Sequence, residues 1–328
     1  MDTNNAEMFS PKTLVEAIRF FADAQNCHDF IVPLRWPNGI TCPRCESAKH
    51  SFISTRKVWK CKGCKKQFTV KLGTIMEDSP LGLDKWLTAM WMITNAKNGI
   101  SSWEIHRAIG VTQKSAWFLL HRIRLAMESG GFKFDGEVEA DETFIGGKAR
   151  NMHADKRKQK ITSRGASGKA IVIGVLDRET RKVSTKHVPD RQRGTIGEFI
   201  RENVVLGSSI FTDEMPAYNA LVPDYVHEAV DHAVKYVDGN VHTNAMENYW
   251  SLLKRALKGT YVSVEPFHLF RYLAEQAYRY NERRHADGTV KTDGERFVEV
   301  AGMIVGKRLT YKKLTGKDQV DLPGALEA

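Results

Sequence analysis

The stretch GEVEADETFIGG, residues 136–147, begins the part of the chain from which the fold class can be predicted. Apolar and polar side chains alternate through most of it, and two glycines end it, which is the pattern of a β-strand. KAIVIGVLD (169–177) and KVSTKHVP (182–189) predict a second and a third strand. TIGEFIRENVV (195–205) then has helical periodicity, and SSIFTDE (208–214) and YVHEAVDH (225–232) predict two more strands. Three strands, a helix and further strands and helices indicate an α/β layer fold.

A helix is expected over VHTNAMENYWSLLKRALKG, residues 241–259. It has an apolar seam of Met246, Trp250, Leu253 and Leu257. A second stripe beside that seam carries Glu247, Ser251, Lys254 and Lys258. At about 100° per residue this stripe flanks the buried one rather than opposing it. Taken alone, the stripe is typical of a solvated face in which an acid precedes bases and stabilises the helix.

Three acids fall at related places in this pattern. Asp141 lies inside the first strand, Asp213 ends the strand SIFTD, and Glu247 lies on the helix that follows. Acids at strand ends of α/β sheets often line the site. Three converging carboxylates need a cation, and their hard oxygens favour Mg²⁺ or Mn²⁺. Two such ions about 4 Å apart promote phosphoryl displacement. We therefore interpret the stripe as a metal ligand followed by phosphate-binding lysines.

Glu139 and Glu142 neighbour Asp141 and compete with it for this assignment. Successive side chains of a strand point to opposite faces. We therefore expect Glu139 to share the face of Asp141 and Glu142 to point the other way.

Four of the five cysteines form two CxxC pairs, in TCPRC and KCKGC. They are Cys42, Cys45, Cys61 and Cys64. Fifteen residues separate the pairs, and the intervening FISTRKVWK has the composition of strands. Two such knuckles supply four thiolates that close tetrahedrally around one Zn²⁺ ion. We expect a zinc ribbon, and an ordinary core or helix-end position for Cys27.

A helix-turn-helix is predicted from ISSWEIHRAIGVTQKSAWFLLHRIRLAM, residues 100–127. Ser101 or Ser102 can cap a first helix, Gly110 supplies the turn, and Thr112 can cap a second helix that runs to about Met127. Its polar and basic residues favour DNA binding. They are Gln113, Lys114, Arg122 and Arg124.

The chain of 328 residues has a formal net charge of +10 and 42% hydrophobic residues. Two or three domains and an anionic partner, most simply nucleic acid, are expected.

The segment 148–170 is strongly basic and is interpreted as a loop along phosphates or as a solvated spacer. The first residues are polar and acidic, and no apolar run approaches the length of a membrane span, so we expect a cytoplasmic protein that does not enter membranes.

Taken together, DETFIGGK, FTDE and VHTNAMENYWSLLKR behind a paired-CxxC ribbon resemble the bacterial insertion-sequence transposases of the DDE class. The group in question has an N-terminal zinc ribbon and an RNase H-like catalytic core, and the resemblance covers roughly residues 15–285. It implies Asp141 and Asp213 on neighbouring central strands, with Glu247 approaching from the helix. Phe144 stands where a tyrosine is common in that group, and the third ligand is variable there.

The resemblance also implies hydrolytic nicking of double-stranded DNA at transposon terminal inverted repeats, followed by attack of the freed 3′ hydroxyl on target DNA. Joining two ends implies a dimer or a larger assembly. Expected catalytic and Mg²⁺ or Mn²⁺ ligands are Asp141, Asp213 and Glu247. Expected DNA contacts are His242, Asn244, Lys254, Arg255, Lys258, Lys114, Lys156, Arg157 and Lys158. Two other functions remain: a regulator that binds DNA without catalysis, and an RNase H-like nuclease acting on branched or hybrid substrates.

The expected fold class is multidomain α+β, with a zinc ribbon and a helix-turn-helix followed by an RNase H-like α/β catalytic domain. The expected parts are an N-terminal helical segment (1–35), the ribbon (36–75), the helix-turn-helix domain (76–130), the catalytic domain (131–290) and a C-terminal tail (291–328).

Overall fold

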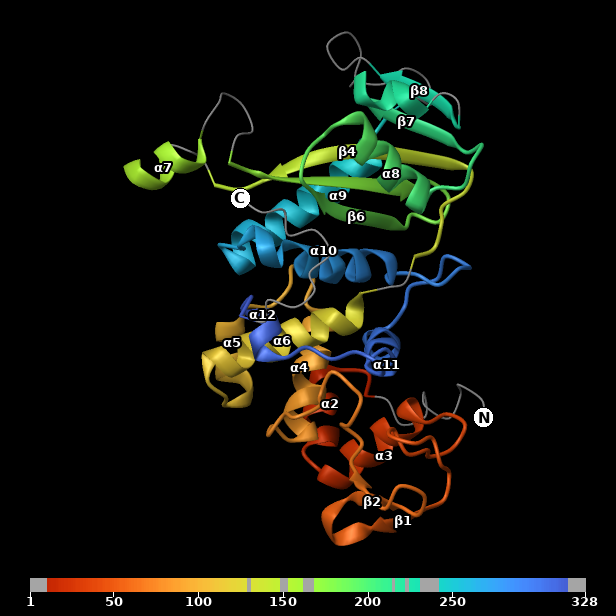
Figure 1. Cartoon of the computed structure of the whole chain (residues 1–328), viewed down its shortest axis with the longest axis vertical. Helices are drawn as coiled ribbons and strands as arrows, with labels where there is room; N and C mark the ends of the chain where they lie inside the picture. The colour runs from red at the N-terminus through yellow and green to blue at the C-terminus, as the bar shows by residue number, and fades with distance from the viewer. Residues whose placement is uncertain are drawn as a thin grey trace. The chain divides into compact units, whose positions relative to one another are not determined.

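A computed structural model describes residues 11–128, 131–147, 153–161, 168–213, 216–221, 224–230 and 242–317. The chain divides into two units (Figure 1). Unit 1 joins the residues up to Met127 with those from Val290 onward. Unit 2 comprises residues 128–289.

The first part of unit 1 pairs two helices with a small sheet. The helices are α2 (Leu14–Phe21) and α3 (Ala24–Arg35). The antiparallel sheet has the order β1 (His50–Ile53), β2 (Val58–Cys61), β3 (Gln67–Phe68), and a 3₁₀ turn, η1 (Ser54–Arg56), joins its first two strands. Cys27 is a core residue, as expected, because it is fully buried and its thiol donates to the carbonyl of Phe21 at 3.1 Å.

Three further helices of unit 1 contain the expected helix-turn-helix. They are α4 (Leu83–Asn95), α5 (Ser102–Ile109) and α6 (Gln113–Met127). Ser101 caps α5 in a reciprocal arrangement with Glu104, and Gly110 takes a left-handed conformation with φ 63°. The Thr112 hydroxyl accepts from the Ser115 amide at 3.1 Å, as an N-terminal cap of α6 does.

The segment from residue 291, expected as a tail, instead belongs to unit 1 in its described part. It contains α11 (Asp293–Gly302) and α12 (Tyr311–Leu314). Phe297 of α11 is fully buried, and its ring lies 5.2–5.5 Å from those of Phe21, Phe30 and Trp91. Farther on, Thr74 pairs with Val305 in a β-bridge. The tail interpretation was wrong because Phe297 of α11 completes a core whose other aromatic members lie more than 200 residues earlier in the sequence.

Unit 2 is built on a five-stranded sheet. Its strands are β4 (Glu137–Ile145), β5 (Ala170–Asp177), β6 (Val183–Val188), β7 (Ser209–Asp213) and β8 (Val226–Val230). The order across the sheet is β6-β5-β4-β7-β8. The first three strands are antiparallel neighbours, whereas β7 runs parallel to β4 and β8 runs parallel to β7. This order and these directions confirm the expected RNase H-like fold.

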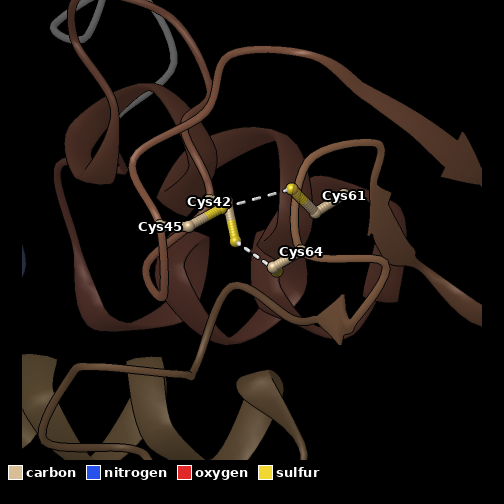
Figure 2. A group of neighbouring side chains, drawn as sticks. All are labelled: Cys42, Cys45, Cys61 and Cys64. Carbon is tan, nitrogen blue, oxygen red and sulfur yellow. Dashed lines mark hydrogen bonds between the residues drawn. The ribbon is translucent and has the colours of Figure 1, made fainter.

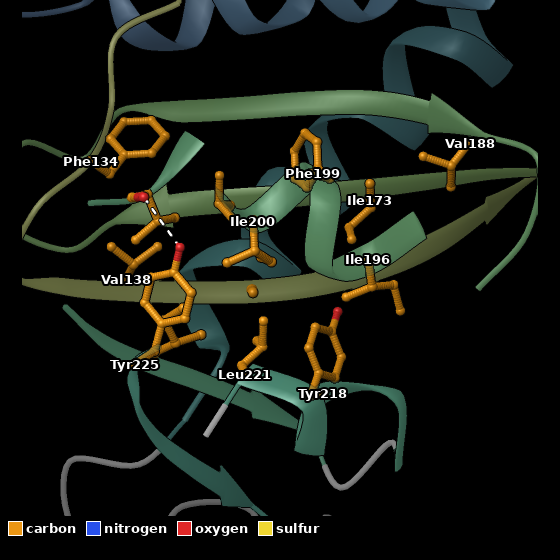
Figure 3. Close-up of a cluster of buried hydrophobic side chains, with 14 residues drawn as sticks. Phe134, Val138, Ile173, Val188, Ile196, Phe199, Ile200, Tyr218, Leu221 and Tyr225 are labelled. Carbon is orange, nitrogen blue, oxygen red and sulfur yellow. Dashed lines mark hydrogen bonds between the residues drawn. The ribbon is translucent and has the colours of Figure 1, made fainter. Parts of the chain in front are cut away.

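Helices cover both faces of this sheet (Figure 1). On one face, α8 (Arg193–Asn203) and the 3₁₀ segment η3 (Pro216–Leu221) bury a cluster that includes Val138, Ile173 and Phe199 (Figure 3). On the other face lie α9 (Asn244–Ala256), a π-helical turn η4 (Leu257–Tyr261) and α10 (Pro266–Asn281). The side chains of β4 and β5 alternate between the two clusters, as the period of a strand requires.

The apolar seam expected on α9 is the buried one. Met246, Trp250, Leu253 and Leu257 all lie in the cluster shared with α10. Among the residues that the structure describes, no helix is long and apolar enough to cross a membrane.

Candidate active site and zinc centre

The four cysteine thiols of unit 1 converge on one point (Figure 2). The sulfur atoms of Cys42 and Cys64 are 3.8 Å apart, and those of Cys45 and Cys61 are 3.5 Å apart. A tetrahedral zinc ion with bonds of 2.3 Å separates its sulfur ligands by about 3.8 Å. The geometry therefore fits a Zn²⁺ ion held by four thiolates.

The backbone of each knuckle is shaped for this convergence. Glu46 and Lys65, which directly follow the second cysteine of each pair, take left-handed conformations with φ 59° and 61°. The Glu46 amide donates to the Cys42 carbonyl at 2.8 Å, and the Gly63 amide lies 3.3 Å from the Cys61 sulfur. The tight turns let two cysteine side chains that are three residues apart in sequence face the same point.

In unit 2, the pairing of β4 with β7 brings two of the predicted acids together. The parallel register pairs Glu139 with Phe211, and its continuation by two residues sets Asp141 level with Asp213. Carboxylate oxygens of Asp141, Glu142 and Asp213 lie within 4.8 Å of one another. The group could hold a metal ion, and oxygen ligands of this kind suit Mg²⁺ or Mn²⁺.

The electrostatics of this acidic group favour a cation. Burial, together with the neighbouring charges of Glu142 and Asp213, raises the pKa of Asp141 to about 7. Burial and the charge of Asp213 also raise the pKa of Glu142. Like charges this close disfavour each other's ionised form, and a bound divalent ion would reverse that penalty.

Glu142 belongs to this group although it points to the opposite face of the strand from Asp141. The expected alternation holds: Asp141 accepts from the Trp250 indole of α9, whereas Glu142 accepts from Tyr218 of η3. The carboxylate tips nevertheless converge beside β7. Sequence alternation fixed the face of each side chain correctly, but it did not reveal that both carboxylates reach the same edge.

Both oxygens of Glu142 already have protein partners. The Tyr218 hydroxyl donates to one at 3.1 Å, and the Arg191 guanidinium contacts the other at 3.0 Å. Arg191 also lies over the ring of Phe144, 4.9 Å from its centroid. Phe144 thus supports the arginine that neutralises Glu142.

Glu247 lies at the same site but outside the tight acidic group. It lines a pocket of about 410 Å³ together with Asp141, Glu142, Thr143, Trp250, Ser251 and Lys254. Burial lowers the pKa of Lys254, while the charge of Asp141 opposes that shift. Glu247, Ser251 and half-buried Lys254 of the predicted stripe therefore share this pocket with the acids of β4.

The start of α9 is held by a buried carboxylate that sequence reasoning did not assign. Glu139 is fully buried, and one of its oxygens accepts from the amides of Ala245 and Met246 at 2.9 and 3.0 Å. Its other oxygen accepts from Arg178 at 3.0 Å. A negative charge at a helix N-terminus is favourable, and here it ties α9 to the strand that carries Asp141. In the sequence, the one sign that Glu139 belongs to this site was strand alternation, which predicts that it lies on the same face of the strand as Asp141.

Comparison with known proteins agrees with this architecture. Residues 133–281 match the family described as the ISXO2-like transposase domain, and residues 22–67 match the transposase zinc-ribbon domain. The chain belongs to the ISXO2-like transposase family.

Two relatives illustrate the extent of this similarity. The uncharacterized protein in transposable element ISH50 of Halobacterium salinarum is 27% identical over 255 residues, which cover 73% of this chain and 85% of the relative. An uncharacterized transposase-like protein of Haemophilus influenzae is 31% identical over 101 residues, which cover 30% of this chain and 81% of the relative.

Among solved structures, the HTLV-2 integrase catalytic core domain in its trimeric form matches 49% of this chain and 96% of its own length, at 13% identity and a TM-score of 0.29. A simian T-cell lymphotropic virus intasome matches 60% of this chain and 70% of its own, at 13% identity and a TM-score of 0.31. These likenesses are slight, and the strand order of unit 2 is what defines its fold.

Several residues expected to contact DNA in this ISXO2-like transposase are exposed. They are Asn244, Arg255 and Lys258 of unit 2, Lys114 of α6, and Arg157 and Lys158. The last two lie on a short helix, α7 (Ala154–Lys160), within the segment expected as a basic loop. The side chain of Lys156 and residues 148–152 and 162–167 lie outside the described residues.

Other residues expected to contact DNA or to favour its binding have contacts within the protein. Arg122 and Arg124 are buried, and Arg122 donates to the Leu309 carbonyl at 3.0 Å. Leu309 lies on the returning C-terminal segment of unit 1, so that segment packs against the Arg122 guanidinium, and burial leaves this side chain little surface to offer DNA. His242 contacts Glu139 at 3.3 Å and so belongs to the anchor of α9.

Proposed function

We propose that this ISXO2-like transposase cleaves DNA strands at transposon ends and transfers the freed 3′ hydroxyls to target DNA, with Mg²⁺ or Mn²⁺ at the acidic group. The convergence of Asp141 and Asp213 beside the pocket that Glu247 and Lys254 line carries this proposal. Both reactions displace an oxygen at phosphorus, so one site serves both in turn. Because the substrate is DNA, the cytoplasm is the expected compartment.

The donor set of the pocket suits such ions. When bound, the ions would activate the attacking oxygen and stabilise the leaving oxygen. Asp141 and Asp213 would hold them from adjacent strands, with the third carboxylate supplied across the pocket. Lys254 can bind a phosphate oxygen beside the acids, since its ammonium is a compact cation with three donors.

Glu247 suits the role of third ligand better than Glu142. The Arg191 guanidinium, 3.0 Å from one oxygen of Glu142, already neutralises the charge of that carboxylate and so weakens its attraction for a divalent ion. Glu247 faces the pocket from α9, whose position the Glu139 anchor fixes. Asn244, one turn earlier, would offer only a neutral oxygen, which binds a divalent ion more weakly than a carboxylate does.

The deciding experiment incubates the purified full-length chain with a labelled transposon end and Mg²⁺ or Mn²⁺, and maps the nick. Asp141→Asn and Asp213→Asn keep the side-chain shape but remove the charge that holds the ions, so both should abolish cleavage while DNA binding persists. Cleavage at the wild-type rate by either variant would mean that the site is misplaced.

A second set of variants assigns the third ligand. Glu247→Gln should abolish cleavage without abolishing DNA binding, Asn244→Ala should retain measurable nicking, and Lys254→Ala should weaken binding of the cut end. Glu142→Gln should reduce cleavage less than Glu247→Gln does. An active Glu247→Gln protein together with an inactive Glu142→Gln or Asn244→Ala protein would transfer the ligand role to the residue whose replacement inactivates.

DNA recognition is assigned to the helix-turn-helix and to the basic segment 148–170. Lys114 and the capped start of α6 are exposed in unit 1, and Arg157 and Lys158 are exposed on α7. Replacing Arg157 and Lys158 by Gln should flatten the dependence of binding on salt, because fewer counterions are released. Joining two ends further requires two copies of the site, so we propose a dimer or a larger assembly on DNA.

A further inference from the structure

Asp141 is held by hydrogen bonds at both of its carboxylate oxygens. The indole N–H of Trp250 donates to Oδ2 at 2.9 Å, and the amide of Glu142 donates to Oδ1 at 2.8 Å. Each carboxylate oxygen has two lone pairs, so each keeps one for a further ligand. The two donors therefore fix the direction of the carboxylate without using up its capacity to bind an ion.

Trp250 reaches Asp141 because the neighbouring strand lacks a side chain at one point. Gly174 of β5 pairs directly with Asp141 of β4. A Cβ atom at Gly174 would lie 2.8 Å from Cη2 of Trp250 and 2.6 Å from Cε of Met246. The flexible end of a methionine can move aside, but a buried indole is rigid and has no comparable freedom. Gly174 thus provides the space in which the Trp250 ring lies against the sheet.

A buried indole needs an acceptor for its N–H, and many tryptophans meet this need with a backbone carbonyl. Here the acceptor is one of the acids proposed to bind metal. On α9, Trp250 also stands between Glu247, three residues before it, and Lys254, four residues after it. All three side chains line the pocket. The hydrogen bond therefore joins Asp141 to the apolar seam of α9, beside the stripe that carries Glu247 and Lys254.

We propose that Trp250 is a positioning residue for Asp141, and that Gly174 is the position in the sheet that makes this contact possible. The inference rests on the proposed function, since it assigns the indole to a carboxylate that would bind Mg²⁺ or Mn²⁺. Its role is to hold the Asp141 carboxylate in the direction that the ion requires, and to keep Glu247 and Lys254 at a fixed distance from it.

The test measures Mn²⁺ binding to the zinc-loaded full-length chain, from the electron paramagnetic resonance signal of free Mn²⁺, beside cleavage as a function of Mn²⁺ concentration. Trp250→Phe removes the N–H and should raise the Mn²⁺ dissociation constant by about 10- to 100-fold, the usual effect of losing a group that orients a metal ligand. Cleavage should recover as Mn²⁺ is raised. The matched control is Tyr249→Phe, which removes a hydroxyl from the adjacent, fully buried residue of α9 and should leave Mn²⁺ affinity unchanged.

Gly174→Ala tests the same contact without altering the indole. It should displace the ring and weaken Mn²⁺ binding in the same direction as Trp250→Phe. The double variant Gly174→Ala, Trp250→Phe removes the rigid indole atoms that clash and leaves only the flexible end of Met246 to move aside, so its melting temperature should recover relative to Gly174→Ala while its Mn²⁺ affinity stays low. That split separates the role of the N–H from simple packing.

Failure of this inference is distinct from failure of the proposed function. Wild-type affinity for Mn²⁺ in folded Trp250→Phe or in Gly174→Ala would overturn the positioning role alone. The proposed function would fail if the wild-type chain bound no Mn²⁺, or if Asp141→Asn bound Mn²⁺ as well as the wild-type chain does. Either result would show that the acidic group is not the metal site.

Discussion

Glu139 shows how much a single side chain contributes to this site. It is fully buried two residues before Asp141, and it contacts the first turn of α9, Arg178 and His242. Arg178 in turn lies over the ring of Phe211 on β7, 3.9 Å from its centroid. The Glu139 carboxylate thus links the central strand β4 to α9, the helix that carries Glu247, and to Arg178 and His242.

We expect Glu139→Gln to destabilise unit 2 by about 3 kcal/mol, because it leaves the Arg178 charge without its buried partner. Urea denaturation followed by far-UV circular dichroism measures the change. Glu137→Gln is the matched control, since Glu137 contacts the same guanidinium at 3.3 Å but its side chain is 49% exposed. It should cost under about 1 kcal/mol, as exposed ion pairs do. Equal costs for the two variants would contradict a buried anchor.

At the scale of elements, the zinc ribbon folds around its ligands rather than around a large apolar core. Its strands are two to four residues long. Trp59 stacks on Phe68 at 5.7 Å and lies 5.1–5.3 Å from the rings of His28, Trp36 and Phe52, so a small aromatic cluster lies beside knuckles that are shaped by turns. Ribbons of this size depend on the metal for much of their folding free energy.

The purified chain should contain one tightly bound zinc ion, and Cys61→Ser should lose most of it. Elemental analysis gives the zinc content directly, and proteolysis within residues 42–64 reports the unfolding of the ribbon. Cys27→Ser is the control, because Cys27 lies in the apolar core and outside the group of four thiols. An unchanged zinc content in Cys61→Ser would refute the assignment.

At the scale of the whole molecule, unit 2 is inserted into unit 1. The chain leaves unit 1 after α6, builds the RNase H-like sheet, and returns as α11. Phe297 then packs among aromatic residues of α2, α3 and α4. The stability of the unit that carries the ribbon and the helix-turn-helix therefore depends on residues near the other end of the sequence.

Phe297→Ala should destabilise unit 1 by about 3–5 kcal/mol, the usual cost of removing a buried phenylalanine. Val305→Ala, at a side chain that is 45% exposed on the same returning segment, should cost far less. Hydrogen exchange resolves the two units: protection should fall in α2 to α4 of Phe297→Ala and stay unchanged in the sheet of unit 2. A matching loss of protection in β4 and β5 would contradict two separate units.

Features that depend on the local order of residues could be predicted from the amino-acid sequence. The spacing of Cys42, Cys45, Cys61 and Cys64 predicts the ribbon, and periodicities of two and 3.6 residues predict the strands of unit 2 and the buried seam of α9. The pairing of Asp141 with Asp213 came from the family resemblance. Four features became visible in the folded chain alone: Glu142 joins those acids, Glu139 caps α9, Arg122 is buried, and α11 belongs to unit 1. Those features depend on contacts between segments far apart in the sequence. A local pattern predicts which face of a strand or helix carries a side chain, but it does not predict which other segment packs against that face.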